Sequence, residues 1–305
     1  MVLPPVEPSR RARAPEVLSA QAALLAWFRA DGPAYPWRRT EDDPYAVLVS
    51  EVMLQQTQAG RVVQAFPTFL ERFPDVGALA AASRADVLRA WGGLGYPRRA
   101  AALQDAARII IRDLDGSVPG DVRSLQELPG VGPYTAAAVA SIAFGEPIPA
   151  IDTNARKVMA RLALGLEPHE ASSADISGAA ARWLSRDAPG DWNQAVMNLG
   201  REVCRPTPRC DVCPLADVCR FHASGRATER GSRRSGRSQP AFEGSMRQVR
   251  GGVLRELRGR DRAATIGTIA AALSLPVTRV DGAVDALESD GLLERTSSGR
   301  IRLPR

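Results

Sequence analysis

Lysine is almost missing from this chain of 305 residues. Lys157 is the only one, so the net charge of +6 comes almost entirely from arginine. Chemistry that needs a lysine amine, such as Schiff-base formation, therefore has a single candidate residue. The basic charge suits a polyanionic partner, but an excess of arginine and alanine also follows from genome base composition, so the charge alone identifies no partner.

Long apolar runs are missing as well. No segment approaches the roughly 20 consecutive apolar residues of a membrane-spanning helix. Residues 1–15 are rich in proline and arginine and lack the apolar stretch of a secretory signal. We therefore expect a disordered arm at residues 1–15, no membrane partner and a cytoplasmic protein.

Helical periodicity dominates the chain before residue 222. Apolar residues recur at helical spacing in segments 18–30, 44–56, 61–73, 83–91, 98–114, 135–144 and 176–186. Strand-like alternation is scarce before residue 290. The pattern predicts a mainly α protein whose catalytic region, residues 16–222, has two helical lobes.

The composition changes after residue 222. Residues 223–244 combine arginine with serine and glycine, which indicates a flexible basic linker that is either a tether or a nonspecific phosphate contact. Residues 245–305 predict helices at 247–257, 266–273 and 278–287, followed by a hairpin over 292–303. This order is typical of a small winged-helix-like α+β module, which either packs against protein or contacts DNA.

Residues 128–135, Leu-Pro-Gly-Val-Gly-Pro-Tyr-Thr, predict a tight turn between two helices. Gly130 and Gly132 indicate a backbone too tight and too bare for residues with a Cβ. A helix that follows such a turn presents free backbone N–H groups, which can hold a phosphate. Asp152 follows just beyond and would lie near a nucleotide held there. Alternatively, the segment is an ordinary helical hairpin and Asp152 caps a helix.

All four cysteines lie within one short stretch, with the spacing C-x5-C-x2-C-x5-C. They are Cys204, Cys210, Cys213 and Cys219. Four thiols this close in a cytoplasmic chain predict a soft metal centre rather than two disulfides. The compact spacing favours a 4Fe–4S cluster, and zinc is the alternative. Because cysteine supplies every ligand, we expect a closed, structural centre.

Glu51 lies in the segment Ser50-Glu51-Val52-Met53-Leu54-Gln55-Gln56-Thr57. On a helix, the neighbouring methionine and leucine would partly desolvate its carboxyl group and favour the protonated form, as a general acid requires. Considered without its context, an ordinary surface glutamate is the simpler interpretation.

Taken together, these segments resemble the helix-hairpin-helix DNA glycosylase superfamily, and within it the MutY adenine glycosylases. The specific motifs are Pro36-Trp37-Arg38, the Glu51 segment and Gly93-Leu94-Gly95-Tyr96. The hairpin and the cysteines are shared with endonuclease III relatives. The resemblance covers residues 18–221 and implies a six-helix lobe at about 36–150 and a cluster lobe at 16–35 plus 151–222.

The resemblance also implies a reaction. An adenine opposite 8-oxoguanine or guanine is flipped out of double-stranded DNA, and its N-glycosidic bond is hydrolysed. Glu51 matches the general acid that protonates N7 of adenine and then activates water. Asp152 matches the carboxylate that stabilises the sugar cation. Asn154 and Tyr134 match two further residues of the catalytic site.

Several residues match DNA contacts of the family. Gln56 and Tyr96 match residues that wedge into the base stack, which offsets the cost of unstacking. The full set expected to contact DNA is Arg38, Gln56, Tyr96, Gly130, Val131 and Gly132. Many MutY enzymes read 8-oxoguanine with a C-terminal Phe-Ser-His loop. Here both histidines, His169 and His222, precede the C-terminal module, so that loop is absent.

Tyr134 stands where strand-cutting relatives have a lysine, so we expect a monofunctional glycosylase, and a monomer. A mismatch glycosylase that removes thymine or uracil opposite guanine is the first alternative. Glu51 favours adenine, because departure of a purine gains from N7 protonation while a pyrimidine leaves as an anion. A non-enzymatic iron–sulfur DNA-binding regulator is the alternative of another class.

Overall fold

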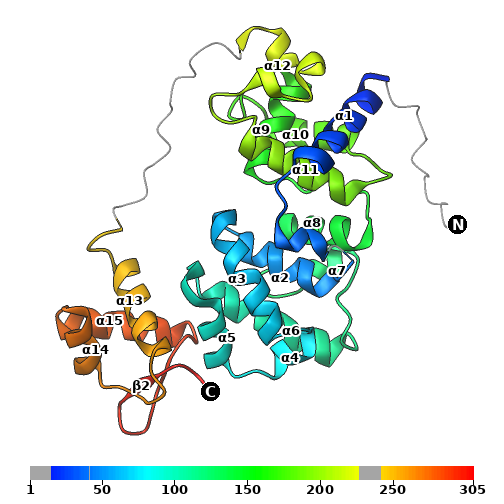
Figure 1. The fold of residues 1–305 in the computed structure, drawn as a ribbon. Helices are drawn as coiled ribbons and strands as arrows, with labels where there is room; N and C mark the ends of the chain where they lie inside the picture. The colour runs from blue at the N-terminus through cyan, green and yellow to red at the C-terminus, as the bar shows by residue number, and fades with distance from the viewer. Residues whose placement is uncertain (1–14, 41, 227–241) are drawn as a thin grey trace, which may run out of the picture. The chain divides into compact units, whose positions relative to one another are not determined.

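The computed structural model describes residues 15–40, 42–226 and 242–305 (Figure 1). Most of the expected arm, residues 1–14, and much of the basic linker, residues 227–241, lie outside the described residues. Contacts divide the chain into two compact units, which are residues 1–33 with 145–232 and residues 34–144 with 233–305. In the described ranges, the only strands are the short pair β1 (Glu294–Arg295) and β2 (Ile301–Arg302), so the expected mainly α fold is confirmed.

The unit of residues 34–144 and 233–305 is built around α2 (Pro44–Leu54), which is buried from Tyr45 to Met53. Asp43 starts this helix, since its side chain accepts hydrogen bonds from the backbone N–H groups of Tyr45 and Ala46 at 3.0 and 3.2 Å. A helix that is apolar on every side must be covered on every side.

The elements of residues 34–144 are η1 (Pro36–Arg39), α2, α3 (Ala59–Arg72), α4 (Val76–Ala81), α5 (Arg84–Trp91), η2 (Gly92–Leu94), α6 (Arg98–Asp113), α7 (Val122–Gln126) and α8 (Pro133–Phe144).

The C-terminal module belongs to the same unit. It consists of α13 (Met246–Arg258), α14 (Ile266–Leu273), α15 (Val277–Ser289), β1 and β2. The strands pair antiparallel with Glu294 opposite Arg302. Several hydrogen bonds attach the module to the helical lobe. The Ala85 N–H donates to the Pro304 carbonyl at 2.8 Å, Arg89 donates to the Arg260 carbonyl at 3.3 Å, Arg258 donates to the Gly92 carbonyl, and Arg98 pairs with Asp290. The expected order of three helices and a hairpin is present.

The other unit holds α1 and the chain from residue 145 to the cysteines. Its elements are α1 (Pro15–Asp31), α9 (Thr153–Met159), the π-helical turn η3 (Ala160–Leu164), α10 (Ser173–Trp183), α11 (Pro189–Glu202), η4 (Cys210–Val212), η5 (Ala216–Val218) and α12 (Arg220–Ala223). The helix α11 packs against both α1 and α9. Buried Gln21 of α1 donates to the carbonyls of Trp183 and Leu184, both at 3.0 Å, so α1 is tied to the end of α10.

The apolar pattern placed most helices correctly but missed α4, α9, α11 and the short α12. Two predicted helices differ clearly from the observed bounds. The helix expected over 44–56 ends at Leu54, because Gln56 has a left-handed backbone with φ 53°. The helix expected over 176–186 starts earlier, at Ser173 behind the capping side chain of Ser172, and ends at Trp183. Among the described residues, no helix combines the length and the apolar character that crossing a membrane requires.

Candidate functional site

Glu51 lies near the end of α2 and is only 5% exposed. Its neighbours along the helix, Val52 and Met53, are buried in the apolar core. The desolvation expected from the sequence is therefore present, and an ordinary surface glutamate is wrong as an interpretation. The buried position follows from the apolar character of α2 on all its faces.

The chain beyond α2 is connected to the glycine hairpin. Gln55 Nε2 donates to the Gly130 carbonyl at 3.1 Å and contacts Thr135 Oγ1 at 3.0 Å. The next residue, Gln56, is exposed and left-handed. The sequence motif had singled out Gln56, whereas the residue that joins the two segments is Gln55.

The hairpin runs from the end of α7 at Gln126 to the start of α8 at Pro133. Gly130 needs glycine twice over, because its φ is +79° and a Cβ there would lie 2.9 Å from the Cβ of Ala102. The steric argument was wrong for Gly132, whose φ is not in the left-handed range and whose Cβ would meet nothing within 4 Å. Val131 is buried, and Tyr134 is half-buried at the second position of α8.

Tyr96 lies between η2 and α6 and is 49% exposed. Its backbone is left-handed with φ 46°, and Gly95 before it has φ +81°. A left-handed conformation is unusual for a bulky side chain and occurs where surrounding contacts impose it. Arg38 is half-buried in η1, next to Trp37, whose ring stacks on Tyr35 at a centroid distance of 4.5 Å.

Asp152 and Asn154 lie in the other unit, at the start of α9. Asp152 is the N-cap of this helix, and its Oδ1 accepts a hydrogen bond from the Ala155 N–H at 2.6 Å. Asn154 Nδ2 donates to Asp152 Oδ2 at 2.9 Å. Both carboxylate oxygens are therefore held in place, and Asp152 caps a helix, as the alternative interpretation expected. Lys157, one turn further along, contacts Asn154 Oδ1 at 3.5 Å, and burial lowers the pKa of its amine.

The four cysteines line one small cavity of about 30 Å³, together with Arg161 and Phe221. Burial raises the pKa of the Cys213 thiol to about 12 and raises that of Cys210 and Cys219, and neighbouring cysteine thiolates add to each rise. In the described part of the chain, no three histidine, cysteine or carboxylate side chains form a preassembled metal-binding group.

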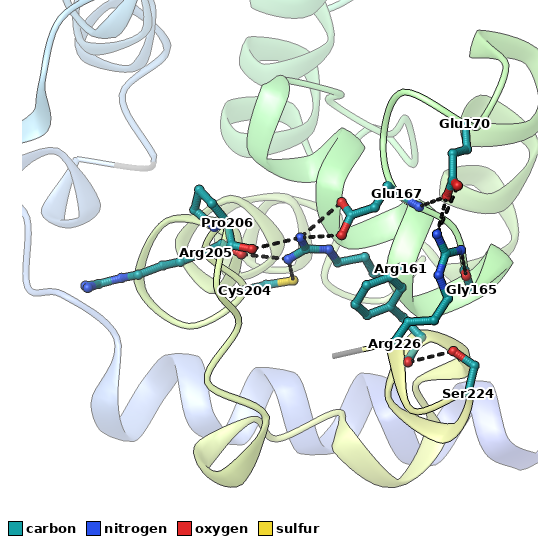
Figure 2. Close-up of polar contacts among 10 residues, drawn as sticks. Arg161, Gly165, Glu167, Glu170, Cys204, Arg205, Pro206, Ser224 and Arg226 are labelled. Atoms are coloured by element: carbon teal, nitrogen blue, oxygen red, sulfur yellow. Dashed lines mark hydrogen bonds and ion pairs between the residues drawn. The ribbon is translucent and has the colours of Figure 1, made fainter. Parts of the chain in front are cut away.

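Arg161 connects the cysteine loop to the helical part of its unit (Figure 2). Its guanidinium donates to the Arg205 carbonyl at 2.6 Å and to both carboxylate oxygens of Glu167 at 2.9 and 3.1 Å, and lies 3.6 Å from Cys204 Sγ. Burial disfavours the charged form of Arg161, but the hydrogen bonds to Cys204 and Glu167 outweigh it and raise its pKa. The sequence held one signal for this residue, a single arginine in the otherwise apolar run of residues 158–164.

Comparisons with known proteins agree with this arrangement. The HhH-GPD family, described as the HhH-GPD superfamily base excision DNA repair protein, matches residues 49–177. An adenine DNA glycosylase of Mycobacterium tuberculosis is 42% identical over 284 residues, which cover 92% of both chains. The chain belongs to the adenine DNA glycosylase family.

More distant relatives cover less of the chain. The human adenine DNA glycosylase is 41% identical over 216 residues, which are 67% of this chain and 40% of the human protein. A thermostable thymine-DNA glycosylase structure superimposes with a TM-score of 0.63 at 26% identity and covers 68% of this chain and 97% of its own. A structure of endonuclease III in a covalent DNA complex has the same fold, with a TM-score of 0.58 at 23% identity, covering 69% and 97%. The expected helix-hairpin-helix glycosylase fold is thus confirmed.

Proposed function

We propose that the chain removes adenine paired with 8-oxoguanine or guanine from duplex DNA by hydrolysing the N-glycosidic bond. The observation that carries the choice of base is the buried carboxyl group of Glu51 in the apolar helix α2. A carboxyl group among apolar side chains holds a proton more readily than one in water. Adenine departs easily only when its N7 is protonated. A carboxyl group that can donate this proton therefore favours a purine as the base that is removed.

Glu51 delivers that proton to N7, and the bond from the base to the sugar carbon then breaks. The sugar is left as an oxocarbenium-like cation, and its charge is the main feature that the protein must stabilise. Asp152 supplies the stabilising negative charge. Its carboxylate is held by Asn154 and by the Ala155 N–H, so little reorganisation is needed as the cation forms. Glu51, now ionised, accepts a proton from the water that attacks the sugar.

Base release requires that the adenine first leaves the stack. The exposed Gln56 and Tyr96 enter the space near the lesion and offset part of the unstacking cost. The backbone of the hairpin, Gly130 to Gly132, holds a DNA phosphate at the start of α8, and Arg38 adds a positive charge. Tyr134 offers no amine for a Schiff base, so the enzyme leaves an abasic site and does not cut the strand.

The four cysteines would hold a 4Fe–4S cluster. The donor set suits such a cluster, because all four thiols line one cavity. His222 also lines this cavity, and its Nδ1 lies 3.1 Å from the Ala216 carbonyl. The cluster supplies structural cross-linking when bound. We also propose that Arg205, Arg209 and Arg220 in the same segment contact phosphates of the DNA backbone.

The assay that tests this function presents duplexes with A·8-oxoguanine, A·G, T·G or U·G and then adds alkali to cut at abasic sites. We expect cleavage of the two adenine substrates only, with no cleavage before alkali. Cleavage confined to T·G and U·G would establish the thymine or uracil alternative, which the fold of the thymine-DNA glycosylase supports. Binding without release of any base would favour the DNA-binding regulator. Light scattering of the protein with and without duplex tests the expected monomer.

A further inference from the structure

Arg99 lies at the start of α6 and is half-buried. Its guanidinium makes five hydrogen bonds to acceptors on two separate segments. One segment is the end of α2, where the carbonyls of Val52 and Met53 accept at 2.9 and 3.0 Å, the carbonyl of Gln55 at 2.5 Å, and Thr57 Oγ1 at 2.8 Å. The other is the loop before α6, where the Gly95 carbonyl accepts at 3.2 Å.

The two segments share an unusual feature directly after the carbonyls that Arg99 binds. Gln55 precedes Gln56, and Gly95 precedes Tyr96. Both following residues are exposed and left-handed, with φ values of 53° and 46°. Such backbones persist in residues other than glycine only where neighbouring contacts hold them. Arg99 supplies such a contact at each position.

The chemistry of this position requires arginine. The last carbonyls of a helix have no partner within the helix, and a planar guanidinium presents several donors to them at once. The guanidinium also lies over the rings of Trp91 and Tyr96, at 5.3 and 5.4 Å from their centroids. Burial lowers the pKa of Arg99 to about 10, which leaves it charged at neutral pH.

We propose that Arg99 is a positioning residue that holds the Gln56 and Tyr96 segments in place relative to the helix that carries Glu51. Opening of the base stack and protonation of the base then both depend on one guanidinium. The inference rests on the proposed function, because it assigns Arg99 to the excision step through Gln56 and Tyr96.

The test uses Arg99→Lys in the full-length protein, with single-turnover release of adenine from an A·8-oxoguanine duplex as the main measurement. Lysine keeps the charge but cannot reach five acceptors, so we expect the rate to fall by about tenfold to a hundredfold. Arg84→Lys is the matched control. Arg84 is another partly buried arginine of this lobe that binds a backbone carbonyl, that of Ala101 at 2.6 Å, but it contacts neither segment. We expect it to stay within about twofold of the wild-type rate.

A second experiment distinguishes a role through Gln56 and Tyr96 from a purely structural role of Arg99. It repeats Arg99→Lys in a protein that already carries Gln56→Ala and Tyr96→Ala. If Arg99 acts through these two residues, the added loss shrinks to less than about twofold. Fluorescence of 2-aminopurine at the target position should also show that Arg99→Lys unstacks the base less than the wild type does. A full additional loss in the triple variant, or an unchanged rate in Arg99→Lys, would overturn the inference and leave the proposed function intact. A wild-type protein that releases no adenine would overturn the function, and the inference with it.

Discussion

Asn154 and Asp152 form a 2.9 Å hydrogen bond in which the amide Nδ2 donates to carboxylate Oδ2, while Oδ1 of the same carboxylate accepts from the Ala155 N–H. This pairing leaves Asp152 with one orientation. A carboxylate that is fixed before the reaction stabilises a developing positive charge better than one that must first reorient. The pair is therefore where we expect mutation to separate catalysis from stability most clearly.

Asp152→Asn removes the charge but keeps the helix cap, because asparagine caps a helix as well as aspartate does. We expect the single-turnover rate to fall by at least about a hundredfold, while the midpoint of thermal unfolding stays within about 2 °C and duplex affinity within about threefold. Asn154→Ala keeps the charge and should cost about tenfold in rate. Near wild-type turnover of Asp152→Asn would remove Asp152 from the mechanism.

Gly200→Ala tests the close packing of α11 against Asn154, the partner of Asp152. Gly200 lies on α11, and a Cβ there would lie 2.7 Å from the Cβ and 2.8 Å from the carbonyl oxygen of Asn154. Since backbone atoms cannot yield as a side chain does, we expect a loss of about 1–3 kcal/mol in the free energy of unfolding and a reduced rate. Gly178→Ala, at an exposed position of α10, is the control, since its Cβ would meet nothing within 4 Å and alanine favours a helix by roughly 0.5–1 kcal/mol. Equal stability of the two variants would contradict the close packing of α9 on α11.

Cys213→Ser tests the metal centre. Wild-type protein should be brown, with broad absorption near about 400 nm from sulfur-to-iron charge transfer, and the variant should lose that absorption. We also expect the unit that contains α9 and α11 to unfold at a lower temperature, because the cross-link between the loops is lost. Asp217→Asn, an exposed change in the same loop, should keep the colour. A colourless wild-type protein with one bound zinc would decide for zinc.

Asp290→Asn tests the attachment of the C-terminal module. Hydrogen bonds from Arg98 and then Arg250 hold the pKa of the Asp290 carboxyl below its usual range. Because the folded-state pKa is lower than the unfolded one, this stabilisation is present above about pH 4 and is lost as the pH falls through the folded-state value. In urea unfolding at neutral pH we expect the variant to be about 1–2 kcal/mol less stable, with a difference that narrows at acid pH. A difference that is unchanged at pH 3 would contradict the ion-pair explanation, and Asp261→Asn on the exposed surface serves as the control.

Two helices show which parts of the fold the local sequence pattern could predict. The segment 266–273 was predicted to the residue from its apolar spacing, and the structure shows that the side chain of Thr265 caps its start. The pattern missed α11, whose role depends on contacts with α1 and α9 that lie far away in the chain. Its glycine at position 200 has no local reason to be glycine, and only the approach of Asn154 explains it.

In the candidate site, too, some features follow from local sequence and others only from the tertiary structure. The sequence by itself determined which residue types are present for the chemistry: a glutamate in an apolar helix, an aspartate after a glycine hairpin, and four closely spaced cysteines. Those assignments depend on short motifs whose meaning does not need distant neighbours. Tertiary structure alone decided how they are held, through Gln55 on the hairpin, Arg161 on the cysteine loop and Arg99 between two left-handed residues. The bonds of Gln55 to Gly130, of Arg161 to Arg205 and of Arg99 to Gln55 join residues 44 or more positions apart. Such bonds leave no periodicity in the sequence, so no local pattern could have predicted them.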